Sequence, residues 1–130
     1  MATFKSFEDI EAWQRARILA NKIFDICQEG KFSKDFKLRD QINGSSGSIM
    51  DNIAEGFERN GSREFVQFLA IAKGSAGEVR SQLYRTLDRS YISEKTFSEL
   101  KNDAIVISKL ISGLINYLNQ SSLKGAKFVR

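Results

Sequence analysis

Four glutamates near the middle of the chain are the residues with the clearest potential for chemistry. Glu55 and Glu58 are three residues apart and would share one side of a helix, and Glu64 and Glu78 follow in the next predicted helix. Carboxylate oxygens are the ligands that Mg²⁺ prefers. The set lacks a second Glu-x-x-Asp pair and a phosphate-binding loop. We therefore expect neither a metal nor another cofactor, and we keep an acidic site only as an alternative.

Other catalytic groups are scarce in the sequence. It contains no histidine, which removes the commonest general acid/base near neutral pH and the commonest metal ligand. Cys27 is the single cysteine, and it falls on an apolar helical face with no histidine to activate it. The segment GSSGS at 44–48 has neither the preceding strand nor the GK[ST] ending of a phosphate loop. We therefore expect a protein that is not an enzyme.

Positive charge is concentrated in the second half of the chain. The net charge is +4, and residues 66–130 hold ten Lys/Arg against five Asp/Glu, whereas residues 1–65 hold ten against eleven. A surplus of this kind is compatible with contacts to the phosphates of RNA or DNA. Tyr84 and Tyr91 are the nearby aromatic residues that could stack on bases. The candidate nucleic-acid-binding residues are Lys73, Arg80, Arg85, Arg89, Lys124, Lys127 and Arg130.

A second basic cluster lies earlier in the chain, around Asp35. We expect it to be a solvated loop followed by the first turn of a helix, with phosphate contact as the alternative. Its members are Lys31, Lys34, Lys37 and Arg39.

Apolar residues recur every three or four positions along four stretches, which is the spacing of one helical face. The first stretch begins at Ser6, which forms a capping-box-like pair with Asp9, and ends near Gly30. The second spans about 35–58, the third starts at Ser62 and the fourth at Ser93. This pattern predicts an all-α, antiparallel up-down-up-down four-helix bundle in a single domain. We expect residues 1–120 to form the bundle and 121–130 to be a flexible basic tail.

Two helices contain unusual surfaces. Small residues at 44–48 and 74–77 interrupt helices in which each glycine costs about 1 kcal/mol relative to alanine, so we expect the helices to approach closely there. Residues 65–72 are apolar almost all the way round, and Ile105, Val106 and Ile115 widen the apolar face of the last helix. Helices that are apolar on more than one side predict a subunit interface.

The sequence shows no targeting or membrane signal. No apolar run reaches the roughly 18 residues that a membrane-spanning helix needs, and the N-terminus lacks the apolar core of a signal peptide. The single cysteine cannot form an internal disulfide, which fits a reducing compartment. We therefore expect a cytoplasmic protein with no membrane partner.

Four short motifs carry a family resemblance: IEAWQRA at 10–16, NIAEG at 52–56, SREF at 62–65, and AKGSA at 72–76 followed by Glu78. Together they resemble the bacterial four-helix-bundle family named after proteins encoded in intervening sequences of 23S rRNA genes, the S23 family. The resemblance covers about residues 7–118. The residues of this chain at the family's motif positions are Gln41, Asn52, Glu55, Gly56, Glu64, Gly74, Ser75 and Glu78.

The resemblance implies an up-down bundle that assembles into a homo-oligomer, a homopentameric ring, with no established enzymatic activity. The family is similar to accessory proteins of diversity-generating retroelements, which are basic pentamers thought to bind nucleic acid and a reverse transcriptase. The polar motif residues would either form an acidic site or satisfy backbone groups at the turn and the helix ends. Two functions stay open: an oligomeric bundle that binds RNA or DNA, and an oligomeric protein–protein interaction adaptor whose charges are ordinary solvated surface.

Overall fold

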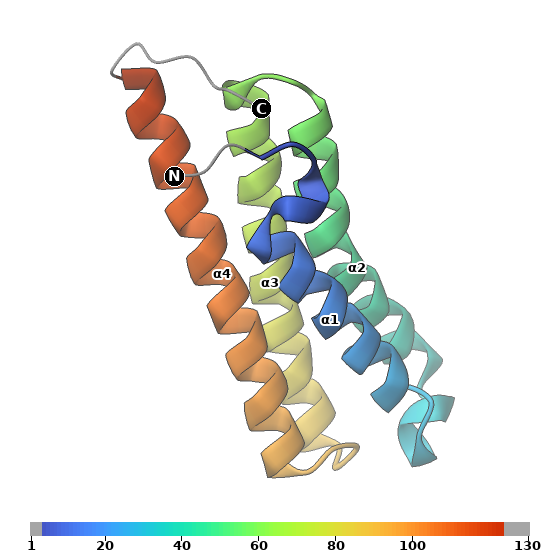
Figure 1. Ribbon diagram of the computed structural model, residues 1–130. Coiled ribbons are helices and arrows are strands. Elements are labelled where there is room, and N and C mark those ends of the chain that lie inside the picture. The colour runs from blue at the N-terminus through green and yellow to red at the C-terminus, as the bar shows by residue number, and fades with distance from the viewer. Residues whose placement is uncertain (1–3, 124–130) are drawn as a thin grey trace.

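The computed structural model describes residues 4–123 and contains four α-helices joined by short connections (Figure 1). Successive helices run in opposite directions, and no strand occurs within residues 4–123. The predicted all-α four-helix bundle is therefore confirmed. The helices are α1 (Glu11–Ile26), α2 (Phe36–Glu58), α3 (Ser62–Asp88) and α4 (Glu94–Leu123), with 3-10 turns η1 (Phe7–Asp9) and η2 (Gly30–Lys34) before and after α1.

Helices α2 and α4 begin at the predicted positions, and in each a side chain caps the first turn. The carboxylate of Asp35 accepts a hydrogen bond from the backbone N–H of Leu38 at 3.2 Å. The hydroxyl of Ser93 accepts one from the backbone N–H of Thr96 at 3.1 Å. Each bond satisfies a backbone donor that the first turn of a helix leaves without a partner.

Three boundaries differ from the prediction. The carboxylate of Asp9 does accept from the backbone N–H of Ser6, at 3.3 Å, but this pair caps the 3-10 turn η1 instead of α1. Helix α1 ends at Ile26, and Gly30, with φ of +48°, opens η2 rather than closing α1. Helix α4 continues to Leu123, three residues into the segment that we expected to be a tail.

One apolar core runs along the axis between the four helices, and each helix contributes residues at the predicted three- and four-residue spacing. Burying one such side chain contributes about 1.5–3 kcal/mol relative to leaving it in water. Residues that are fully or almost fully buried include Leu19, Ile23, Leu38, Ile42, Ile49, Ile53, Phe65, Leu69, Leu83 and Ile107.

The predicted groups of small residues bring α2 and α3 together through their serines and not through their glycines. At four glycines of these groups, a Cβ atom built on the backbone would meet no atom within 4 Å. The prediction of close packing holds for the serines, since Ser75 donates to Ser48 at 3.0 Å, and it was wrong for the glycines, which face away from the neighbouring helix. Glycine itself is required at Gly56, where a Cβ would lie 2.6 Å from the Cβ of Phe68. The four glycines are Gly44, Gly47, Gly74 and Gly77.

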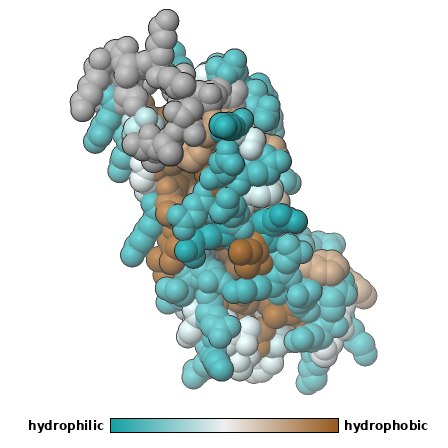
Figure 2. All heavy atoms as spheres, in the orientation of Figure 1, coloured by the Kyte–Doolittle hydropathy of each residue, from teal (hydrophilic) through white to brown (hydrophobic). Residues whose placement is uncertain are grey.

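Some apolar side chains remain exposed after the bundle has formed. Ile71 of the apolar segment 65–72 is 52% exposed, whereas the residues that widen the apolar face of α4 are half-buried. On α1, Ile18 and Phe24 are 55% and 54% exposed. Figure 2 shows hydrophobic spheres that interrupt the hydrophilic surface over this side of the molecule. Part of the predicted subunit-interface surface is thus free in the single chain.

Candidate nucleic-acid interface

A basic stripe runs along the side of α3 that faces α4. Lys73, Arg80 and Tyr84 are spaced at i, i+7 and i+11, which places them on one face of the helix. Tyr84 fixes the direction of that face, because its ring centroid lies 4.8 Å from that of Phe97 in α4. Lys101 of α4 has its Nζ 5.4 Å from the same Tyr84 ring. We call Lys73, Arg80, Tyr84 and Lys101 the α3·α4 face.

The α3·α4 face has acidic residues at one end, because Asp88 follows Tyr84 by four residues on α3 and Glu94 precedes Lys101 by seven on α4. Among the described residues, its three cations form no ion pair. Asp103 of α4 points the other way and accepts a hydrogen bond from Lys22 of α1 at 3.0 Å. No aspartate or glutamate follows Asp103 in the sequence. The three cations of the face are therefore not held in ion pairs by the described residues and are available to a polyanion.

Arg80 is the least solvated cation of the face. The residue is half-buried, and its Nε atom is enclosed without a hydrogen-bond partner among the described residues. A partly desolvated charge interacts with a nearby anion more strongly than a fully hydrated one does. Arg80 is therefore the cation of this face for which a phosphate partner would matter most.

Arg85 and Arg89 were predicted to belong to the same patch, but the structure places them on the opposite side of α3. The guanidinium of Arg85 donates to Gln41 Oε1 at 3.1 Å, and that of Arg89 donates to Asp35 Oδ2 at 2.6 Å, so both reach toward α2. Five residues along a helix correspond to roughly 140° of rotation, which separates Arg85 from Arg80. The other predicted contacts, Lys124, Lys127 and Arg130, lie outside the described residues.

Asp35 joins the two connections at one end of the bundle. It accepts hydrogen bonds from the backbone N–H of Leu38, from Tyr91 Oη at 2.9 Å and from Arg89. These bonds, that of Leu38 foremost, lower the pKa of Asp35, and the hydrogen bond to Asp35 raises the pKa of Tyr91. The charge of Arg89 is thus used within the fold, and one face of the Tyr91 ring is covered by Phe32, with ring centroids 5.0 Å apart.

The α2·α3 seam is lined by polar residues at the family's motif positions. The hydroxyl of Ser75 donates to that of Ser48 at 3.0 Å, and the amide of Asn52 donates to the carbonyl and hydroxyl oxygens of Ser48, each at 2.8 Å. Ser45 donates to Gln82 Oε1 across the same seam. These hydrogen bonds satisfy polar groups that are buried between the two helices.

The acidic motif residues have separate surroundings. Glu55 forms an exposed ion pair with Arg59 at 2.8 Å, and the carboxylate of Glu64 lies beside Gly61 at the α2–α3 turn. Glu78 lines a small pocket in the α2·α3 seam. No group of three or more carboxylate or cysteine side chains in residues 4–123 is placed to hold a metal ion. The alternative of an acidic metal site on these glutamates is therefore not supported.

We call the pocket that contains Glu78 the Gln82 pocket, after its most buried residue. Its volume is about 280 Å³, and it opens to solvent between α2 and α3. It is lined by Gln41, Glu78, Ser81, Gln82 and Arg85.

Cys27 is fully buried at the end of α1. Burial raises the pKa of its thiol, and a hydrogen bond with Asn43 and the charge of Arg39 oppose this effect only in part. A buried thiol with a raised pKa is a poor nucleophile.

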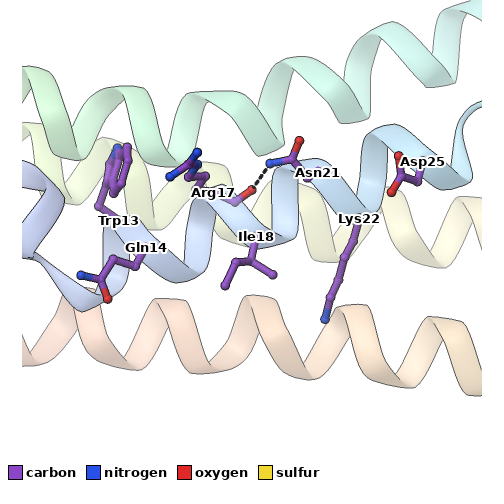
Figure 3. Close-up of a pocket in the computed structure, with 7 residues that line it drawn as sticks. All are labelled: Trp13, Gln14, Arg17, Ile18, Asn21, Lys22 and Asp25. Atoms are coloured by element: carbon purple, nitrogen blue, oxygen red, sulfur yellow. Dashed lines mark hydrogen bonds between the residues drawn. The ribbon is translucent and has the colours of Figure 1, made fainter.

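A groove of about 540 Å³ follows the outward side of α1 (Figure 3). The Arg17 guanidinium carbon lies 5.8 Å from the centre of the Trp13 ring, and the amide of Asn21 donates to the carbonyl oxygen of Arg17 at 2.9 Å. Trp13 is half-buried and packs against the edge of the core. The lining residues of the groove are Trp13, Gln14, Arg17, Ile18, Asn21, Lys22 and Asp25.

A search for membrane spans among the described helices found none of sufficient length and apolarity.

The fold and its surfaces define a helical-bundle protein with a group of cations on α3 and α4. The profile of the family described as "23S rRNA-intervening sequence protein" matches residues 8–113. The chain therefore belongs to that family, and the resemblance noted in its motifs is confirmed.

A solved structure gives the same result. The chain is similar to a protein of unknown function from the S23 ribosomal protein family of Bacteroides thetaiotaomicron, with 25% sequence identity and a TM-score of 0.73. The similarity covers 80% of this chain and 97% of the other. No curated protein matches the sequence.

Proposed function

We propose that this protein is a non-enzymatic, homo-oligomeric helical bundle that binds the phosphate backbone of RNA or DNA through its α3·α4 face. The observation that carries the proposal is that Lys73 and Arg80 share the side of α3 that carries Tyr84, with Lys101 beside its ring, and that none of the three cations is ion-paired among the described residues. Contacts of this kind position a protein on a nucleic acid without reading its sequence. Tyr84, 45% exposed, offers an aromatic surface at the same place.

A single chain offers few phosphate contacts. Each contact contributes a slope of roughly −0.7 to −0.9 to the dependence of log K on log salt, so three cations bind weakly at physiological salt. A homo-oligomer, such as the ring of five that the family resemblance implies, would present several copies of the face to one strand. Linked copies can raise the overall affinity by roughly 10²–10⁴ without any new type of contact.

Fluorescence anisotropy of a labelled RNA stem-loop and a labelled DNA duplex, at low and at physiological salt, tests the proposal. The variant K73Q/K101Q removes two charges from the α3·α4 face. The matched control K31Q/K34Q removes two exposed lysine charges from η2. We expect the first variant to weaken binding roughly tenfold and to reduce the salt slope, and the control to change either quantity much less.

Equal losses in the two variants would show that binding follows net charge and not this face. Absence of binding at low salt, where phosphate contacts are strongest, would overturn the proposal altogether. The protein would then be better described as an oligomeric adaptor, a function that the exposed apolar side chains Ile18, Phe24 and Phe36 would favour. The proposal of a nucleic-acid-binding bundle also includes a cytoplasmic location and a protein partner such as a reverse transcriptase.

A further inference from the structure

Two glycines in the α2·α3 seam have no structural role within the single chain. Gly44 and Gly74 lie inside long helices, where glycine costs about 1 kcal/mol relative to alanine. A Cβ at either position would meet no atom within 4 Å. The internal packing of the bundle therefore does not require glycine at these positions, whereas the close approach of another backbone would.

The same seam contains a buried polar group with an unused hydrogen-bonding atom. Gln82 is only 6% exposed and lines the Gln82 pocket. Its Oε1 accepts from Ser45, the residue after Gly44, but its amide nitrogen has no hydrogen-bond partner in the part of the chain that the structure describes. The amide nitrogen is not one of the enclosed atoms without a partner, and the pocket beside it is open to solvent. It is therefore free to donate a hydrogen bond to a group that enters the pocket.

The seam continues beyond the Gln82 pocket along α3. Ile71, Gly74 and Glu78 are spaced at i, i+3 and i+7, so they share one side of the helix. Ile71 is 52% exposed, and Glu78 forms no ion pair among the described residues. This surface is longer than the pocket, and the pocket itself has only polar lining residues. A helix fits both features better than a small molecule, which would need an apolar pocket.

The outward side of α1 is complementary to this surface. Phe24, 54% exposed, and Arg17 are seven residues apart, as are Ile71 and Glu78. Arg17 forms no ion pair among the described residues and contacts only the Trp13 ring with its charge. If α1 lies antiparallel to α3, Phe24 meets Ile71 and Arg17 meets Glu78 in the same register. Gly74 then stands between the two contacts and leaves room for the backbone of α1.

We infer that α1 of a second copy of this chain packs along the α2·α3 seam, with Phe24 against Ile71 and Arg17 against Glu78. This inference rests on the homo-oligomer of the proposed function and names the two surfaces that form it. The surfaces lie on different sides of the bundle, so the contact is heterologous. Repetition of a heterologous contact produces a closed ring if the rotation closes.

Sedimentation velocity of the full chain tests this interface over a range of concentrations, with the mass of one chain, 14.7 kDa, as the reference. In the single chain a Cβ at Gly74 would meet no atom within 4 Å, so the variant G74L should keep the helical content and the fold. It should nevertheless raise the dissociation constant of the oligomer by roughly tenfold or more, because a leucine fills the space that α1 occupies. The matched control is G77L, which changes an equally unhindered glycine on the α4 side of the same helix and should leave the mass unchanged.

Charge reversal of Arg17 and Glu78 gives a second, independent test of the interface. R17E and E78R should each dissociate the oligomer, and the double variant R17E/E78R should restore it because the ion pair is re-formed with reversed signs. A wild-type protein of monomeric mass, a G74L variant that stays assembled, or a double variant that stays dissociated would each overturn the inference. The anisotropy assay distinguishes these results from failure of nucleic-acid binding, because E78R removes no positive charge.

Discussion

Replacing Gly56 by alanine should destabilise the protein, although the same change at Gly47 in the same helix should stabilise it. A Cβ at Gly56 would lie 2.6 Å from the Cβ of Phe68 and 3.1 Å from Cδ1 of Phe65. The Cβ of Phe68 is fixed to the backbone of α3, so the helices would have to separate. Overpacking of this kind costs about 1–3 kcal/mol. We expect the upper end, about 3 kcal/mol, less about 1 kcal/mol of improved helix propensity.

The expected net effect of G56A is thus a loss of about 2 kcal/mol in the free energy of unfolding, against a gain of about 1 kcal/mol for G47A. A Cβ at Gly47 meets no atom within 4 Å, so only helix propensity changes there. Urea unfolding followed by circular dichroism, at one protein concentration for all variants, measures both values. If G56A were as stable as G47A, the close approach of α2 and α3 at this level would be refuted.

Two further predictions concern titratable groups. The folded-state pKa of Asp35 is lowered, so its contribution to stability is present above its ordinary pKa of 3.8 and is lost as the pH falls through the folded value. D35N should therefore have a lower Tm than wild type at pH 7, and the difference should shrink below about pH 4; a constant difference would contradict this. Cys27 should react with iodoacetamide at neutral pH at least roughly tenfold more slowly in the folded than in the urea-unfolded protein, and equal rates by mass spectrometry would contradict its burial.

The four helices could be predicted from the sequence because their signals are local. Apolar spacing of three and four residues marks one face of each helix, and Asp35 and Ser93 are capping residues at helix starts. The end of α1 was harder to place. Gly30 is a typical residue just after a helix, but the chain leaves α1 at Ile26 and uses the left-handed conformation of Gly30 to start a 3-10 turn.

The role of the glycines could not be predicted from composition alone. In the segments 44–48 and 74–77 glycine and serine are both small, but serine faces the neighbouring helix and glycine faces outward. Which of the two is buried depends on the rotation of each helix about its axis. That rotation is set by the large side chains of the core, so the glycine whose Cβ would clash with the neighbouring helix is Gly56, outside both segments.

The basic face was predicted in part, for a similar reason. Sequence position grouped Arg80, Arg85 and Arg89, but helical rotation directs the last two toward α2. Lys101 was missed because it is distant in sequence and is brought to Tyr84 only by the antiparallel pairing of α3 and α4. A helical projection that compared α3 with α4 could have found it, since both residues lie just beside the apolar face of their helix.

The hydrogen bonds of Asp35 also have a consequence for the order of folding. Most contacts in an up-down bundle join neighbouring helices, and such short-range contacts let helical proteins fold fast. Asp35 and Arg89, by contrast, are 54 residues apart, and Asp35 and Tyr91 are 56 residues apart. Closing so long a loop is entropically unfavourable until α2 and α3 have paired, so this contact forms after the transition state. Loss of Asp35 should then accelerate unfolding and leave the folding rate nearly unchanged. The hydrogen bonds of Asp35 would thus slow the opening of a bundle whose helices have already paired.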